Sequence, residues 1–229
     1  DHTLLGEGAL LRHLHSYLWW ALAVLAAAAL FRRAFSPRVA WIATFGYALA
    51  PCHAMPLAWI ANREVLVSLA FGIAGLIAYL RWRQKHRAGD AALATLLFSG
   101  ALLAGEYGVS FGGYVLAFEL VRFGAARSGG ENEPLVRRAL AMLPFVAPAT
   151  LYLLARAHLG YGTIGSGYYL DPLHDPVLFL WMAPRRLAML LGEGWFSLDQ
   201  DTLTWAVPSW AMILGALLVG AVLVATFRR

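Results

Sequence analysis

Apolar residues along this chain come in long runs, and short clusters of charged residues separate the runs. The clearest run covers residues 65–80 and is followed by four basic residues, Arg81, Arg83, Lys85 and Arg87. A water-soluble helix has one polar face, whereas this run is apolar on every side of a helix. About 20 apolar residues cross a bilayer, and basic residues collect at its cytoplasmic side. The run therefore predicts a membrane span with its basic end in the cytoplasm.

The same pattern predicts further spans on both sides of this one. We expect spans over residues 14–31, 39–50, 65–80, 140–159 and 205–227, and two short spans within 91–120 that meet at the turn 105–108. The run 39–50 is short for a bilayer, so it either tilts or continues past Pro51 as a bent helix. Pro144 and Pro148 should kink the span 140–159. The fold class expected is an all-α polytopic membrane protein with about seven transmembrane helices and an outer interfacial helix.

Residues 160–201 form the longest part without a predicted span, and we expect an outer loop with an interfacial helix there. The helix, or two short ones bent at Pro184, should cover 177–191, because this aromatic segment is interrupted by Arg185 and Arg186. The glycines at 160, 162 and 165 match a nucleotide-binding fingerprint, but the strand and helix that it requires are not expected around them. This glycine-rich stretch is therefore predicted to be a loop.

The distribution of basic residues predicts which loops are cytoplasmic. Five of the eighteen basic residues fall outside in this arrangement, and they are Arg12, Arg63, Arg156, Arg185 and Arg186. The others fall inside, as the positive-inside rule requires. All of the basic residues except Lys85 are arginines, which is typical of GC-rich bacterial genomes. We therefore expect a multi-pass protein of the bacterial inner membrane with a cytoplasmic C-terminus.

Composition supports a membrane protein with a single domain over residues 1–229. Apolar residues make up 60% of the chain and charged ones 14%, whereas soluble domains carry about 25% charged residues. The net charge of +5 does not indicate nucleic-acid binding, because the basic residues lie in clusters between apolar runs. Cys52 is the only cysteine, which excludes an internal disulfide. The chain begins with Asp1 rather than methionine, so we expect it to be a piece of a longer protein.

The polar stretch before the central span is the strongest candidate for chemistry. Arg63 lies at the predicted outer face, where its guanidinium could hold a phosphate through two parallel hydrogen bonds. The alternative is an interfacial arginine that pairs with Glu64 or extends to lipid headgroups. Asn62 could donate to a phosphate or sugar oxygen, and the ring of Trp59 could form a wall of the same site. All of these are predicted donor-phosphate-binding residues.

Carboxylates on the outer side are candidates for catalysis or for ion pairs. Asp1 or Glu7 could act as general base toward an acceptor hydroxyl, although surface carboxylates are common. Glu106 lies at the outer turn between two short spans, where an ionisable group is costly unless it is used or paired. It either supports the site or forms a structural pair with Arg63 or Arg156. At the inner end, we expect Glu119 to pair with an inner arginine such as Arg122.

Histidines on the outer side invite a metal interpretation, which the spacing does not support. His13 and His15 are two residues apart, not the four that bring two ligands together on a helix. His2 and His53 have no acidic partner at a fixed spacing. No metal site is therefore assigned, and His53 is kept as a supporting residue of the Arg63 site.

Two stretches resemble the GT-C class of polytopic glycosyltransferases, and within it the bacterial relatives of the protein O-mannosyltransferases. The first has His53, the pair Trp59-Ile60, Arg63 and a span that ends over residues 79–83 in tyrosine and arginines. The second is the hairpin that carries Glu106, where Gly105 replaces the lysine that this family commonly has. The resemblance covers roughly residues 14–123.

The resemblance implies transfer of a sugar from a polyprenyl-phosphate donor at the periplasmic face. It also implies a catalytic acid in the first outer loop, which makes Asp1 and Glu7 the candidate catalytic residues. The partners expected are the lipid-linked sugar donor and membrane lipids, with no nucleic acid. No cofactor is assigned, although some enzymes of this class use a divalent cation.

Two other functions are considered. The first is a non-catalytic membrane scaffold or subunit that binds lipid or protein partners, which the replacement of the lysine by Gly105 favours. The second is a transporter, which is weakened because the sequence has neither an evident inverted repeat nor a charge in the middle of a span.

Overall fold

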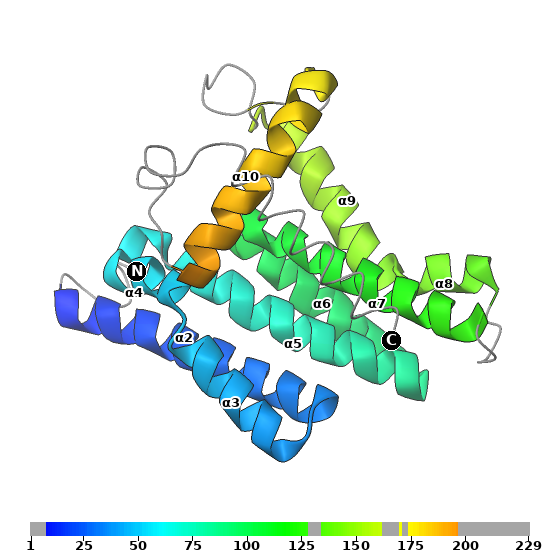
Figure 1. The fold of residues 1–229 in the computed structure, drawn as a ribbon, viewed down its shortest axis with the longest axis horizontal. Helices are drawn as coiled ribbons and strands as arrows, with labels where there is room; N and C mark the ends of the chain where they lie inside the picture. Colours follow the sequence, from blue (N-terminus) through cyan, green and yellow to red (C-terminus); the bar gives the residue numbers. More distant parts are fainter. Residues whose placement is uncertain (1–7, 128–133, 162–169, 171–173, 197–229) are drawn as a thin grey trace. The chain divides into compact units, whose positions relative to one another are not determined.

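The structure of this protein is a computed structural model that describes residues 8–127, 134–161, 170 and 174–196. Within these residues every regular element is a helix, which confirms the all-α prediction (Figure 1). The elements are α2 (Ala9–Ala34), α3 (Pro37–Ala48), η1 (Pro51–His53), α4 (Ala54–Ala58), η2 (Ile60–Asn62), α5 (Glu64–Lys85), α6 (Ala88–Ala104), η3 (Glu106–Ser110), α7 (Phe111–Arg127), α8 (Leu135–Ala141), α9 (Leu143–His158) and α10 (Pro176–Phe196).

The chain divides into two compact units. The first contains residues up to 49 and from 53 to 159, and so it holds the helices from α2 to α9. The second contains residues 50–52 and the chain from 160 onward, which includes α10. The candidate residues of the Arg63 site that the structure describes all belong to the first unit.

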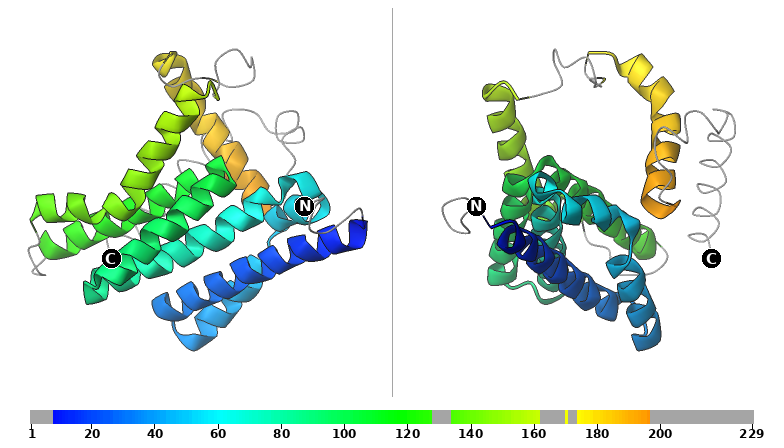
Figure 2. Two further views of the ribbon diagram at one scale, coloured as in Figure 1. Left: turned by 180° about the vertical axis from the view of Figure 1, so that it is seen from behind. Right: turned by 90° about the vertical axis from the view of Figure 1, so that its left-hand side faces the viewer.

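Helix α5 lies at the centre of the first unit, between α2 on one side and α6 and α7 on the other (Figures 1 and 2). This position explains why its sequence is apolar all round, since several of its faces meet neighbouring helices. Close approach depends on two glycines. The ring of Phe111 occupies the space where Gly72 has no side chain, and the ring of Phe98 does the same at Gly75.

Contacts between side chains fix the directions of α2 and α5. Ser16 meets Arg63 near the start of both helices, and about one turn further along α2 and two turns further along α5 the rings of Trp19 and Phe71 are 5.6 Å apart. Both partners advance along the chain together, so α2 and α5 run parallel. Between these two helices in the chain, the short helix α3 packs against α2.

Helix α6 runs antiparallel to α5. The guanidinium of Arg81, near the end of α5, is 3.1 Å from the carboxylate of Asp90 at the start of α6. Gly100, near the end of α6, contacts the ring of Phe71 in the first half of α5. The predicted hairpin is confirmed, because α6 ends at Ala104 and the chain turns through η3 into α7.

A buried polar cluster joins α5 to α7 at the end opposite Arg63. The Nε of Arg83 donates to Glu119 Oε1 at 2.8 Å, and its Nη2 donates to Oε2 at 3.1 Å. The hydroxyl of Tyr79 donates to the same carboxylate at 2.7 Å. Glu119 therefore pairs with an inner arginine, as expected, but that arginine is Arg83 rather than the suggested Arg122. Residues 119 and 122 lie on one helix, whereas the facing surface of α5 offers a partner that is buried together with Glu119.

The number of spans in the described residues is smaller than the seven that the sequence predicts. Two helical stretches are long and apolar enough to cross a membrane, Ala9–Ala34 and Ile60–Lys85. A third span results if the bent pair α8 and α9 is counted as one. Helix α6 is apolar but has only 17 residues. The predicted span 205–227 lies outside the described residues.

The structure has the expected bend within the predicted span 140–159 and one continuous helix around Pro184. The bend of 56° in the predicted span 140–159 lies between α8 and α9, ahead of Pro144, which occupies the first turn of α9. Proline fits that turn because the missing N–H has no partner there in any case. Pro148 lies inside α9, and Pro184 lies inside the single continuous helix α10. The helix predicted over 177–191 is thus confirmed, and its position relative to a membrane stays a prediction.

Large apolar side chains cover much of the outside of the helices. Exposed fractions above 65% occur at Trp41, Ile42, Leu103 and Val136, for example. Isolated exposed apolar residues are normal on soluble proteins, but a continuous apolar surface is typical of contact with lipid or with other proteins. Together with the long apolar helices, this surface identifies the chain as an α-helical membrane protein.

Candidate functional site

The chain before α5 is a series of short turns that ends at Arg63. Pro51 begins η1, Trp59 has an extended backbone between α4 and η2, and Arg63 is the N-cap residue of α5. The run 39–50 therefore ends as α3 at Ala48 and does not continue past Pro51 as a bent helix. These breaks bring the polar residues of the candidate site to the end of α5 that lies beside the start of α2.

The side chain of Arg63 is buried against the first two turns of α2, with an exposed fraction of 6%. Its Nε donates to Ser16 Oγ at 2.9 Å, and its Nη2 donates to the backbone oxygen of Arg12 at 2.6 Å. Its Nη1 lies 2.9 Å from His15 Nδ1. The three nitrogens of the guanidinium thus all contact α2. A buried charge is costly unless hydrogen bonds compensate it, and these contacts supply that compensation.

His15 has two neighbours that can only donate. Trp19 Nε1 donates to His15 Nε2 at 2.9 Å, and Arg63 faces the other ring nitrogen. A neutral imidazole has one acceptor nitrogen, so His15 accepts from Trp19 or from Arg63 but not from both at once. We refer to Arg12, His15, Ser16 and Arg63 below as the α2–α5 junction.

The other two predicted donor-binding residues lie next to this junction in the chain. The side chain of Trp59 is 59% exposed, and Asn62 is half-buried. Both are therefore accessible, in contrast to Arg63. An exposed indole beside an amide can stack on a sugar and donate a hydrogen bond to it.

Glu106 forms its ion pair with a different helix. Its carboxylate is 2.7 Å from Nη1 of Arg156, near the end of α9, and this is one of the two structural partners that the sequence suggested. The turn that carries Glu106 also lies beside the start of α5, because a Cβ built at Gly105 would be 3.5 Å from Cγ of Glu64. The structure thus brings the Glu106 turn and the polar stretch to one end of α5.

Asp1 and Glu7, the two candidate catalytic residues, lie outside the described residues, as does His2. Glu7 precedes Gly8 directly, and Gly8 is the N-cap residue of α2. The helix turns that follow these carboxylates in the chain are the ones that hold Arg63. The contact of Arg63 with the start of α2 was not apparent from the sequence, because Arg63 and Ser16 are 47 positions apart.

His53 is a buried histidine that packs against Tyr47. Its exposed fraction is 3%, and its ring meets the ring of Tyr47 edge-on at 4.8 Å. Its Nε2 has no hydrogen-bond partner in the part of the chain that the structure describes. Burial lowers the pKa of His53, because the charged imidazolium is poorly solvated there.

Stability should therefore depend on pH through His53. Its pKa in the folded protein lies below the ordinary value of 6.5, so the unfolded chain binds this proton more readily. We expect the melting temperature to fall as the pH is lowered from 6.5 toward the pKa of the folded state, and to gain nothing from this group above 6.5. Thermal unfolding in detergent, for the natural protein and for His53→Phe, measures the effect. The variant should show a weaker dependence on pH, and an equal dependence in both proteins would contradict the prediction.

A metal site is not formed by the described residues. Within residues 8–127, 134–161, 170 and 174–196, no group of three or more His, Cys, Asp or Glu side chains is arranged to hold a metal ion. His13 and His15 lie on α2, whereas His53 lies in η1.

Comparisons of the chain with protein-family models, with curated proteins and with solved structures give no match.

Proposed function

We propose that this protein is a membrane glycosyltransferase-like protein that transfers a sugar from a polyprenyl-phosphate donor at the periplasmic face. One observation carries the proposal. Arg63, the residue on which the resemblance to the GT-C class centres, is hydrogen-bonded to the first turns of α2, which follow directly after Asp1 and Glu7 in the chain. Such enzymes need an acid in the first outer loop to act close to the phosphate of the donor.

The residues around the α2–α5 junction take separate roles in this proposal. Arg63 supplies positive charge for the donor phosphate, and it also holds the start of α2. The exposed ring of Trp59 and the amide of Asn62 contact the sugar or its phosphate. Asp1 or Glu7 accepts the proton of the acceptor hydroxyl as the new glycosidic bond forms. The pair of Glu106 with Arg156 stabilises the outer turn next to them.

A non-catalytic scaffold is the second candidate, and two observations favour it. The guanidinium of Arg63 is buried and contacts α2 with all three nitrogens, as expected of a residue that only joins two helices. Glu106 is paired with Arg156, and Gly105 stands where the family commonly has a lysine. In this function the protein binds lipid or protein partners without transferring a sugar.

Titration with a polyprenyl-phosphate sugar distinguishes the two functions. Lysine keeps the charge at position 63 but lacks the planar fork of the guanidinium. If Arg63 contributes to phosphate binding, Arg63→Lys should lower donor affinity roughly ten- to hundredfold, which corresponds to the loss of one charge-assisted hydrogen bond. Purified protein in detergent micelles is suitable for the measurement.

Ser16→Ala is the matched control. It removes one hydrogen-bond partner of Arg63 while the guanidinium stays, so it should weaken the junction without a comparable loss of donor affinity. Melting temperatures of both variants separate a folding defect from a binding defect. Equal donor affinities of the natural protein and of Arg63→Lys would favour the scaffold.

A further inference from the structure

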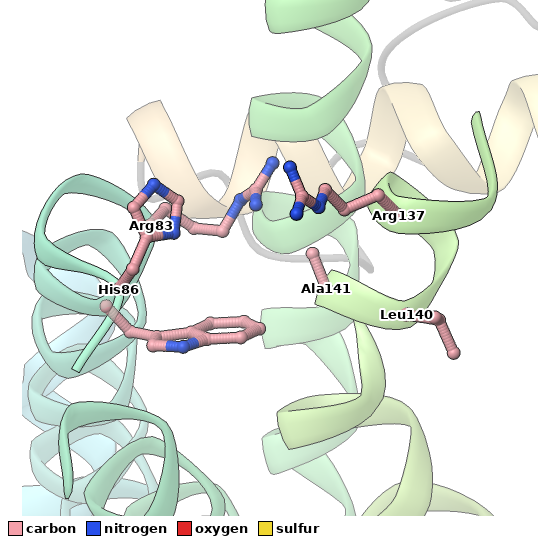
Figure 3. A pocket seen from close by; sticks show the side chains of 6 residues that line it. Arg83, His86, Arg137, Leu140 and Ala141 are labelled. Carbon is pink, nitrogen blue, oxygen red and sulfur yellow. The ribbon is translucent and has the colours of Figure 1, made fainter. Parts of the chain in front are cut away.

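A pocket of about 340 Å³ lies between the end of α5 and helix α8, at the opposite end of α5 from Arg63. Figure 3 shows the guanidinium groups of Arg83 and Arg137 pointing toward one another across it, with the ring of His86 close to Arg83. The remaining lining residues are Trp82, Leu140 and Ala141. The pocket therefore combines two cationic side chains, an imidazole and an apolar wall.

Only one of the two facing arginines is paired with a carboxylate in the described part of the chain. Arg83 is neutralised by Glu119, which binds it through both carboxylate oxygens. Arg137 has no ion pair with a carboxylate in the described part of the chain. Two guanidinium groups that face one another repel, whereas an anion between them is attracted to both.

His86 is held at the pocket by an unusual backbone. It follows α5 with φ 54° and ψ 26°, the left-handed conformation, and its N–H donates to the Trp82 oxygen at 2.7 Å. Histidine tolerates this conformation better than most residues, but an L side chain adopts it at a cost. The resulting turn directs the imidazole to the pocket, where a ring N–H can donate to an oxygen atom.

One effect opposes an anion at this place. The last carbonyl groups of α5 carry about half a negative charge. This half charge is smaller than the full positive charge of Arg137, which no carboxylate in the described residues compensates. The balance of the charges in the pocket therefore favours an anion.

We propose that this pocket binds the phosphate group of an anionic phospholipid. The shared chemistry is a phosphate, and the apolar part of the wall favours a lipid over free phosphate as its source. Beside the lining residue Leu140, which is 56% exposed, Val136 on α8 and Leu143 on α9 are apolar and 70% and 48% exposed. An acyl chain can lie along these side chains while the headgroup phosphate is held by the arginines. Basic pockets between helices on the cytoplasmic side bind lipid headgroups in this way.

The proposal does not depend on the proposed sugar transfer, since the pocket is at the other end of α5. It requires only that this end of the helix reaches the headgroup region of the membrane. The basic cluster at the end of α5 and the predicted orientation of the spans agree with that position.

Native mass spectrometry of the purified protein, titrated with phosphatidylglycerol in detergent, tests the proposal. We expect one tightly bound lipid in the natural protein and an affinity that is about tenfold or more lower in Arg137→Gln. Arg137 is exposed, so the variant should fold normally, which its melting temperature checks. Arg137→Lys should recover part of the affinity, because it restores the charge without the fork.

Arg87→Gln is the matched control. Arg87 is an exposed arginine just beyond His86 that does not line the pocket, so it reports attraction of the lipid to the basic surface in general. Its affinity should stay within about twofold of the natural protein. Equal losses in Arg87→Gln and Arg137→Gln would overturn the proposal, as would equal binding of phosphatidylcholine. Saturable binding of inorganic phosphate without binding of phosphatidylglycerol would overturn the assignment to a lipid.

Discussion

Replacing Glu119 with alanine is expected to lower the free energy of unfolding by about 3–5 kcal/mol. The side chains of Glu119 and Arg83 are only 5% and 3% exposed, and the carboxylate also accepts the hydroxyl hydrogen bond of Tyr79. Alanine leaves the guanidinium of Arg83 buried without this carboxylate, and it removes the acceptor of Tyr79. Both losses act on the contact between α5 and α7.

The melting temperature in detergent, together with unfolding by a denaturing detergent, measures this loss. Glu106→Ala is the control, because it breaks an ion pair with Arg156 whose side chains are 56% and 33% exposed. Exposed pairs contribute about 0–1 kcal/mol, so the control should be much less affected. Similar losses in the two variants would contradict the interpretation of the cluster as a buried pair.

Glu119→Ala could destabilise the protein because the attraction between Arg83 and Glu119 is lost or because the charge of Arg83 stays buried without this partner. A double variant distinguishes these two causes. Replacing Arg83 with methionine and Glu119 with leucine removes both charges while it keeps apolar volume. Substitution of a buried pair by apolar residues is often nearly neutral. We therefore expect the double variant to be more stable than Glu119→Ala, and a lower stability would indicate that the pair is itself strongly stabilising.

The second large effect is expected at Gly108, which lies in η3 against the backbone of α6. A Cβ at this position would be 2.7 Å from the carbonyl carbon of Ala101 and 2.8 Å from the backbone nitrogen of Leu102. Backbone atoms in a packed helix cannot move aside as the end of a side chain can. Gly108→Ala should therefore destabilise the protein by about 1–3 kcal/mol, the usual effect of overpacking.

Gly113→Ala is the matched control, because a Cβ there would meet nothing within 4 Å. Alanine is favoured over glycine inside a helix by roughly 0.5–1 kcal/mol, so this variant should be neutral or slightly stabilised. Melting temperatures of the two variants provide the comparison. A loss of stability in Gly113→Ala as large as that in Gly108→Ala would contradict this interpretation. It would show that these glycines are needed for their backbone conformation rather than for close packing.

Gly108 and Gly112 show what a spacing pattern of small residues predicts about helix packing and what it does not. Two small residues four positions apart predict that a neighbouring helix approaches closely. In the structure a helix backbone approaches closely at Gly108, whereas at Gly112 the close neighbour is a side chain. Gly108 meets α6, whereas the space at Gly112 is filled by the ring of Phe145 from α9. Helical periodicity puts the two glycines on one side of the chain, but it does not identify the neighbours.

The sequence by itself determined the secondary structure and the membrane character of the chain. Helix lengths, apolar periodicity and the breaks at Gly105 and Pro51 depend on residues close together in the chain, and local rules describe them well. This is why α2, α5 and the turn between α6 and α7 agree with the prediction. The bend expected from Pro144 and Pro148 lies directly before Pro144, because proline favours the first turn of a helix, whereas Pro148 lies inside α9.

Only the tertiary structure decided which polar groups meet. Arg63 bonds to Ser16 across 47 positions, and Glu119 pairs with Arg83 across 36. Such pairs depend on how each helix is rotated about its axis, and packing of whole helices against one another sets that rotation. The same holds for the pocket between α5 and α8, because its two facing arginines lie 54 positions apart in the chain and meet only through the fold. The sequence indicates that a buried charged residue requires a compensating partner, but it does not identify which residue that partner is.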